Sequence, residues 1–224
     1  MTAQEALDLL GTDAAKAAEM QSYHKVDRPY LGVATPVIDT AVKGWRDTLD
    51  LEARLALASG LWQSNVHEGR VAAAKLLTQA RIRPDDSAAW DLICAWVPDL
   101  DALGIADLVC VAGQKRLVAD PARLETLAEW AQSENLWARR AAFMMTLPWT
   151  KQNHPKPAEI EVRQRVLGWA ADLVAEKEFL VQDAIAGWLR DLSKHDHDRT
   201  ADFLAEHGPL MKKFVVKEAS RYLG

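Results

Sequence analysis

FLVQDAIAGWLRDLSK, residues 179 to 194, is the stretch that most clearly decides the fold of this chain. Its large apolar residues recur at spacings of three and four, which is the period of an amphipathic α-helix. A second face carries Gly187 between an acid and two cations, although glycine inside a helix costs about 1 kcal/mol relative to alanine. The glycine therefore indicates a face that something large approaches closely. The apolar stripe consists of Ala184, Ile185, Trp188, Leu189 and Leu192.

The rest of the chain repeats this pattern, and no stretch alternates apolar and polar residues for more than a few positions. Turn signals, including Thr35 before Pro36 and Asp120 before Pro121, divide it into roughly ten to twelve helices joined by short loops. Short loops make consecutive helices antiparallel neighbours. We therefore expect an all-α fold, a HEAT-like α-solenoid of stacked antiparallel helix pairs forming one domain over residues 1–224. A compact bundle is the alternative.

Composition narrows the class of protein. Hydrophobic residues make up 49% of the 224 positions, which excludes global disorder. The longest uncharged apolar stretch, residues 141–149, is far shorter than the roughly 20 residues of a membrane span, and the N-terminus lacks signal-peptide order. Cys94 and Cys110 lie in apolar runs, which favours buried thiols over a disulfide or a metal pair. These features predict a monomeric cytoplasmic protein.

The charge is distributed unevenly, although the net charge is -5. Residues 70–83 carry four cations and no acid, and residues 136–165 carry six cations against two acids, whereas residues 84–107 carry six Asp and no cation. A local basic patch can hold a polyanion even on an acidic protein. The alternative is that these charges are ordinary solvated helix faces.

Four stretches, taken in order, resemble the DNA alkylation repair glycosylases of the AlkD type, which are built from HEAT-like repeats. They span residues 20 to 194 and match the family's Y-x-K opening with its P-[FY]-[LF]-G segment, its L-W and H-E-x-R step, its W-x-R-R helix and its late A-I-G-W-x-L-R helix. In this chain they are Tyr23-His24-Lys25 with residues 29–36, Leu61-Trp62 with His67-Glu68 and Arg70, residues 136–140, and residues 179–194.

The resemblance implies an activity. Enzymes of this family hydrolyse the N-glycosidic bond of cationic alkylated purines such as 3-methyladenine and 7-methylguanine in double-stranded DNA, without flipping the base. A cationic base is already a good leaving group, so no general acid is needed. A carboxylate near the sugar stabilises the oxocarbenium-like transition state, and two Trp residues hold the cationic nucleotide.

Carried over by position, the resemblance makes Asp107 the catalytic carboxylate. Leu103 and Gly187 stand where the family has its two Trp residues, and Trp188, one step further on, falls on the core stripe unless a helix bulge turns it outward. Phosphate contacts are implied for Arg140 and Arg190, with Arg139 and Lys194 beside them. Because adjacent helical residues differ by about 100°, one of Arg139 and Arg140 is expected to support the structure. Trp149, beside Lys151 and Lys156, is expected to reach DNA.

Other chemistry is not indicated. The segment His195-Asp196-His197-Asp198 is read as a polar loop rather than a metal site, because no further ligands lie at zinc-like spacing. No glycine-rich phosphate loop, nucleophile elbow or Cys–His arrangement occurs, so neither cofactor nor metal is expected. With two aromatic positions changed, a non-catalytic DNA-binding or protein-interaction module of the same fold stays open as the alternative function.

Overall fold

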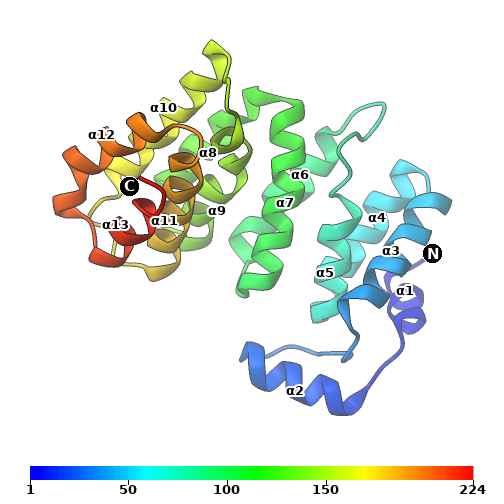
Figure 1. The fold of residues 1–224 in the computed structure, drawn as a ribbon. Coiled ribbons are helices and arrows are strands. Elements are labelled where there is room, and N and C mark those ends of the chain that lie inside the picture. Colours follow the sequence, from blue (N-terminus) through cyan, green and yellow to red (C-terminus); the bar gives the residue numbers. More distant parts are fainter. Residues whose placement is uncertain (224) are drawn as a thin grey trace. The chain divides into compact units, whose positions relative to one another are not determined.

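The computed structural model describes residues 1–223, which form thirteen α-helices, four short 3₁₀-helices and no strand (Figure 1). The chain is therefore all-α, as predicted. The elements are α1 (Ala3–Leu10), α2 (Ala14–His24), α3 (Thr35–Thr48), α4 (Leu51–Gln63), α5 (His67–Leu76), α6 (Ser87–Trp96), η1 (Val97–Asp99), α7 (Leu103–Ala119), η2 (Pro121–Arg123), α8 (Leu124–Ala131), α9 (Leu136–Thr146), η3 (Leu147–Lys151), α10 (Pro157–Asp172), α11 (Phe179–Ser193), α12 (His197–His207), η4 (Gly208–Leu210) and α13 (Lys213–Ala219).

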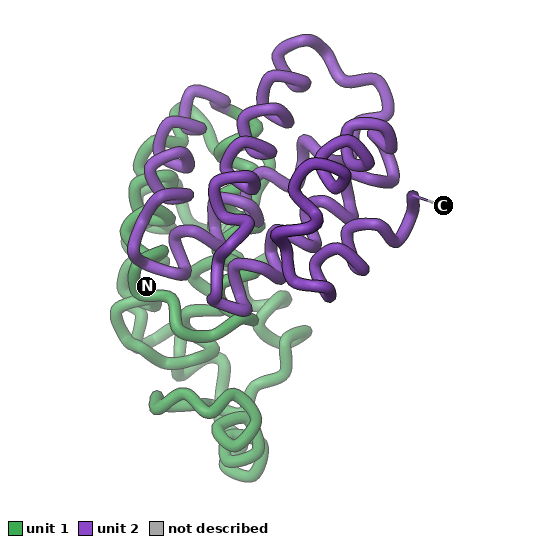
Figure 2. The backbone as a smooth tube through the Cα atoms, turned by 90° about the vertical axis from the view of Figure 1, so that its left-hand side faces the viewer, with its two compact units in different colours: residues 1–119 green, residues 120–224 purple. Residues whose placement is uncertain are grey.

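The chain divides into two compact units, coloured separately in Figure 2. Unit 1 runs from Met1 to Ala119, and unit 2 runs from Asp120 to the C-terminal end. Each unit has its own set of buried apolar side chains, so each is described by itself. A single domain over residues 1–224 stays a prediction.

Unit 1 consists of two rows of helices. Helices α3, α5 and α7 contact one another in succession, and α1, α4 and α6 form the second row against them (Figure 1). Fully buried side chains such as Ile38, Leu61 and Ile93 fill the space between the rows. Helix α2 differs from the others because none of its residues is buried. Its N-terminus is held by the Asp13 side chain, which accepts a hydrogen bond from the Lys16 amide.

Unit 2 repeats this organisation. Helices α9, α11 and α13 contact one another in succession, while α8 packs on α9 and α12 packs on α11. Helix α11 is a continuous α-helix in which Trp188 is fully buried. The indole therefore belongs to the core, as its place on the apolar stripe predicts, and no bulge returns it to the surface.

Two helix starts read from the sequence have different outcomes. Asp120 caps η2 through a hydrogen bond from the Ala122 amide to its carboxylate, which confirms that signal. Thr35 is not a cap, because it is already the first residue of α3 and Ala34 occupies the capping position without a side-chain bond. Pro36 explains the error, since its fixed φ suits either of the first two helical positions.

The thiols of Cys94 and Cys110 are not joined in a disulfide, and Cys110 is buried. Among residues 1–223, no helix is both long enough and apolar enough to cross a membrane.

Candidate nucleic-acid interface

Helix α7 presents the predicted catalytic carboxylate at the surface of unit 1. Asp107 is exposed in the second turn, and Leu103, one turn earlier on the same side, is 45% exposed. The same side continues with the exposed apolar side chains of Val111 and Val118. Their neighbours Ala106 and Val109 face the core. The helix therefore offers one carboxylate on an apolar surface, with an aliphatic group where the resemblance expects an indole.

The two adjacent arginines of α9 are held inside unit 2. The Arg139 guanidinium donates to Glu176 at 2.8 Å and to the carbonyl oxygens of Ser133 and Glu134 at 2.7 and 2.9 Å. It therefore takes the structural role that was expected of one member of the pair. Burial raises the pKa of Glu176, but amide donors from Glu178 and Lys177 and the Arg139 charge outweigh this effect and lower it.

Arg140 and Trp149 correct two of the sequence-based expectations. Arg140 is 4% exposed, so its guanidinium presents almost no surface to a phosphate. Trp149 is 5% exposed and does not reach out to DNA, because η3 packs against both α10 and α11. Its carbonyl oxygen also accepts a 2.7 Å hydrogen bond from Arg163, a fully buried cation that bonds Asp196 as well. Arg163 thus anchors η3 to the core of unit 2.

Gly187 lies on a partly exposed face of α11 with open space above it. A Cβ atom built on Gly187 would meet only the Arg190 Nη2 atom, at 3.9 Å. No protein group therefore requires a glycine here by close approach, and a Cβ atom has room at this position. Because Gly187 has no side chain, the Arg190 guanidinium has no neighbouring side chain from position 187.

Arg190 and Lys194 are the two predicted DNA contacts that reach the surface of unit 2, with side chains 33% and 39% exposed. Arg190 donates to Glu218 of α13 at 2.6 Å and lies 3.3 Å from Asp191. The Glu218 carboxylate raises the pKa of Arg190, and the guanidinium lowers the pKa of Glu218 in turn. Lys194 lies 3.5 Å from Asp191, and its ammonium sits over the Tyr222 ring, 4.7 Å from the centroid.

The H-E-x-R step in unit 1 has a structural role. Glu68 is fully buried, and its carboxylate accepts hydrogen bonds from the amides of Leu31, Gly32 and Val33 at 2.8 to 3.1 Å. Gly32 has φ +76°, and a Cβ there would lie 2.2 Å from the Asp13 carbonyl oxygen. The glycine is required by this close approach. The segment between α2 and α3 is thereby fixed to the N-terminus of α5.

Next to Glu68, an aromatic stack closes the same region. The His67 ring lies 4.4 Å from His24 and 5.0 Å from Tyr30, measured between centroids. Burial, together with the His24 charge, lowers the pKa of His67 to about 4. His67 is therefore neutral at pH 7. Arg70, the last residue of the step, lies 4.5 Å above the Trp62 ring and donates to the Asp99 carbonyl oxygen.

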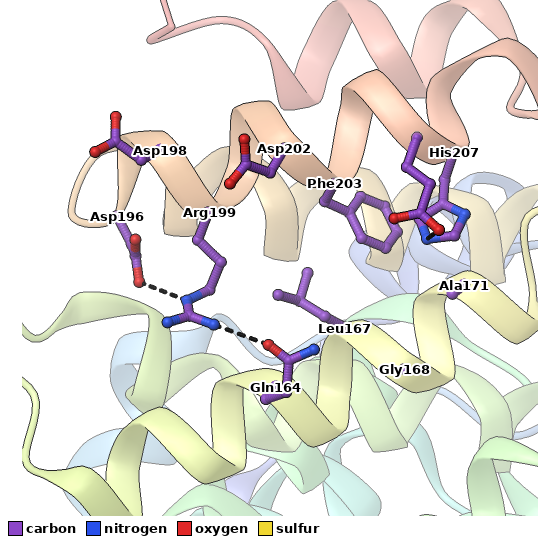
Figure 3. Close-up of a pocket in the computed structure, with 11 residues that line it drawn as sticks. Gln164, Leu167, Gly168, Ala171, Asp196, Asp198, Arg199, Asp202, Phe203 and His207 are labelled. Carbon is purple, nitrogen blue, oxygen red and sulfur yellow. Dashed lines mark hydrogen bonds and ion pairs between the residues drawn. The ribbon is translucent and has the colours of Figure 1, made fainter.

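A pocket of about 410 Å³ lies between α10 and α12 (Figure 3). Its wall carries Asp198, Asp202 and Glu206, and Arg199 is already bonded to Asp196 and Gln164. Such an acidic lining disfavours phosphate, so this pocket is no part of a DNA surface. In the described part of the chain, no three His, Cys, Asp or Glu side chains are grouped so as to hold a metal ion.

A comparison with protein families identifies the chain. The family model described as "DNA alkylation repair enzyme" matches residues 3–223, which is nearly the whole sequence. The chain therefore belongs to the DNA alkylation repair enzyme family.

Solved structures share its fold. A structure described as a predicted DNA alkylation repair enzyme from Enterococcus faecalis matches with a TM-score of 0.81 and 20% identity, covering 96% of this chain and 98% of the other. AlkD2 from Streptococcus mutans gives 0.66 and 21%, covering 94% and 98%, and smu.31 from Streptococcus mutans UA159 gives 0.65 and 22%, covering 84% and 92%. A comparison with curated proteins gave no significant match.

The sequence reasoning missed the partners of the exposed cations. Glu218 and Tyr222 lie on a short, mostly basic C-terminal stretch, for which no role was predicted from the sequence. The one available signal was Glu218 itself, the single acid among the cations Lys212, Lys213, Lys217 and Arg221. Such an acid is a natural partner for a cation on a neighbouring helix, but the sequence does not say which one.

Proposed function

We propose that this protein hydrolyses the N-glycosidic bond of cationic alkylated purines in double-stranded DNA, without flipping the base. The observation that carries the proposal is the exposed carboxylate of Asp107 on α7, at the family position of the catalytic Asp and one turn from exposed Leu103. We expect the protein to act as a monomer in the cytoplasm and to need no cofactor.

The proposed chemistry uses a single carboxylate. An alkylated purine leaves as a neutral base, since its positive charge takes up the electron pair of the breaking bond. Positive charge then develops on the sugar, where the Asp107 carboxylate stabilises it and orients the attacking water. The carboxylate acts in its ionised form and transfers no proton to the leaving base.

The two missing aromatic groups set the expected rate. Leu103 provides apolar contact without a π face, and Gly187 provides neither. Each cation–π contact contributes about 1 kcal/mol, and about 1.4 kcal/mol corresponds to a factor of ten in rate. Loss of both contacts therefore slows excision by roughly thirtyfold relative to a family member with both indoles, if each contact strengthens in the transition state.

Binding is assigned to cations that reach the surface. Arg190 and Lys194 are the partly exposed members of the predicted set in unit 2. Arginine suits phosphate because its planar guanidinium donates two parallel hydrogen bonds. We assign the phosphate contacts to these two side chains.

The test is release of 7-methylguanine from an alkylated duplex, comparing the wild type with Asp107→Asn. This variant keeps the shape of the side chain and removes its charge. We expect wild-type release to exceed that of the variant by at least a hundredfold. Equal rates would end the catalytic assignment. Leu103→Trp serves as a gain-of-function variant, since Leu103 is 45% exposed at the surface.

The second candidate is a DNA-binding or protein-interaction module of the same fold without excision, which the side chains at positions 103 and 187 favour. Salt dependence separates the two kinds of partner. Each neutralised phosphate adds about 0.9 to the slope of log affinity against log salt. A steep slope without base release supports a DNA-binding module, whereas no affinity for DNA leaves a protein partner.

A further inference from the structure

The C-terminal stretch of unit 2 contacts both exposed cations assigned to DNA. Glu218 of α13 accepts a hydrogen bond from Arg190 at 2.6 Å, and the ring of Tyr222 lies under the ammonium of Lys194. The two contacts come from residues four apart, and they meet cations four apart on α11. One short segment thus occupies both groups, and we call Glu218 and Tyr222 the C-terminal cover.

Within the C-terminal cover, Glu218 lies on the surface of α13, a well-packed helix. Val215 and Ala219 of α13 are buried and hold the helix against α11. The Glu218 side chain is 34% exposed and also lies 3.4 Å from Arg221. Changing the charge of Glu218 therefore leaves the packing of α13 intact, so the ion pair can be broken without unfolding the segment.

The Arg190 side chain has space to move into when its guanidinium leaves Glu218. The space above Gly187 is open, and the guanidinium Nη2 atom lies 3.9 Å from the place where a Cβ would be. A side chain at position 187 would restrict the guanidinium on that side. The glycine instead leaves room for the arginine to turn over α11 toward an incoming phosphate.

The ion pair between Arg190 and Glu218 is weak enough for a DNA phosphate to replace the Glu218 carboxylate. Ion pairs between partly exposed side chains contribute little to stability, because water already screens both charges. A DNA phosphate accepts hydrogen bonds from a guanidinium as the Glu218 carboxylate does, and the neighbouring phosphates of the duplex add to its negative potential. The internal pair therefore reduces DNA affinity modestly without blocking binding.

We propose that the C-terminal cover is an internal competitor of DNA, with Glu218 standing in for a phosphate on Arg190 until the duplex displaces it. The inference rests on the proposed role of Arg190 in binding DNA. It makes the C-terminal segment a regulator of affinity. Removing the Glu218 charge frees Arg190 from α13, and displacing the whole segment frees both cations from it, while Asp191 stays beside each of them.

The salt dependence of binding carries a signature of this exchange. Arg190 releases a counterion from DNA when it binds a phosphate. In the wild type, the freed Glu218 takes up a cation at the same time, which cancels part of that release. Without the Glu218 charge there is no such uptake, so the slope of log affinity against log salt becomes steeper by up to about one.

The experiment measures duplex affinity from low to high salt for the wild type, Glu218→Gln and Glu125→Gln. The control is matched in charge, because Glu125 forms a comparable pair with Arg165, at 2.6 Å, between α8 and α10. We expect Glu218→Gln to bind about two- to fivefold more tightly at low salt and with a steeper slope. The control is expected to change neither quantity by as much. Equal changes in both variants would reduce the effect to net charge and overturn the proposal.

A second readout needs no DNA. Modification of Arg190 by phenylglyoxal, followed by peptide mass spectrometry, reports how accessible its guanidinium is. We expect faster modification in Glu218→Gln than in the wild type, and an unchanged rate shows that Glu218 covers nothing. Arg190→Ala separates the two proposals: if it binds DNA like the wild type while Glu218→Gln still accelerates modification, the cover exists and the assignment of Arg190 to DNA fails. Weaker binding by Glu218→Gln would mean that Glu218 orients Arg190 for phosphate, and the competitor role would be wrong.

Discussion

Two glutamates, one in each unit, differ in how far their hydrogen-bonded carboxylates are buried. Glu68 of unit 1 is fully buried and accepts three backbone amides from the segment between α2 and α3. Glu218 of unit 2 is partly exposed and binds the guanidinium groups of Arg190 and Arg221. Because water is excluded around Glu68, no other acceptor can bind its three amides. The Glu218 carboxylate, in contrast, can be replaced on Arg190 by an anion from solution.

Burial therefore divides the motifs of this sequence into two groups. The H-E-x-R step and the first arginine of the W-x-R-R helix are tied to protein partners inside their units. The predicted ligand-binding residues that reach the surface are Asp107 with its exposed apolar neighbours, and Arg190 with Lys194. Stability measurements can test this division directly.

The largest effect is expected for Glu68→Ala. The substitution leaves the amides of Leu31, Gly32 and Val33 without their carboxylate in a buried place, which costs about 3–5 kcal/mol. Urea denaturation of this variant measures the loss of unfolding free energy. Glu125→Ala, which removes an exposed carboxylate, is the control and should lose less than about 1 kcal/mol. Similar losses in both variants would show that burial does not decide the energy.

The next effect is a dependence of stability on pH through His67. Its pKa of about 4 in the folded protein lies below the ordinary value of 6.5, so the unfolded chain binds more protons between these two values. Stability is complete above pH 6.5 and falls as the pH drops to about 4, by up to ~3 kcal/mol. Urea titrations across this range should show a shallower decline in His67→Gln. An identical decline would place the titrating group elsewhere.

Arg139→Ala tests the buried side of the comparison within unit 2. The guanidinium bonds one carboxylate and two carbonyl oxygens, and bonds to charged groups contribute about 1.5–3 kcal/mol. We expect a loss of roughly 2–3 kcal/mol in thermal or urea unfolding. If stability is unchanged and DNA affinity falls instead, Arg139 belongs with the ligand-binding group.

Arg190→Ala is expected to have the smallest effect on stability and a clear effect on binding. Its pair with Glu218 is worth less than about 1 kcal/mol, so the unfolding curve should barely move. Loss of one phosphate contact should reduce the salt slope, but by less than about 0.9, because Glu218 cancels part of the counterion release by Arg190 in the wild type. A large loss of stability without any change in the slope would assign this arginine to the fold.

The sequence predicted the helical class and the interior of α11 because periodicity is a local property. The place of Trp188 followed from its spacing relative to Ala184 and Leu192, and the structure confirms it. Trp149 failed because its lysine and proline neighbours say nothing about α10 and α11, which cover it. Arg140 is buried as well, which the residues around it in the sequence do not predict.

The sequence also did not predict which residues distant in the chain pair with one another. Glu218 lies 28 residues from Arg190, and Glu176 lies 37 residues from Arg139. Each is an ordinary surface-type acid in a polar stretch, and many such acids could have served. The H-E-x-R step was visible as a motif, but the three amides that Glu68 binds are fixed only by the path of the chain around Gly32.

The open place at Gly187 has a consequence for how this surface can evolve. A Cβ atom there meets only the Arg190 guanidinium, and alanine would stabilise the helix by about 1 kcal/mol relative to glycine. Selection for stability alone therefore favours replacement of this glycine. Its presence in α11 is then a consequence of what binds against the helix, and substitution at position 187 can change the ligand without changing the core of unit 2.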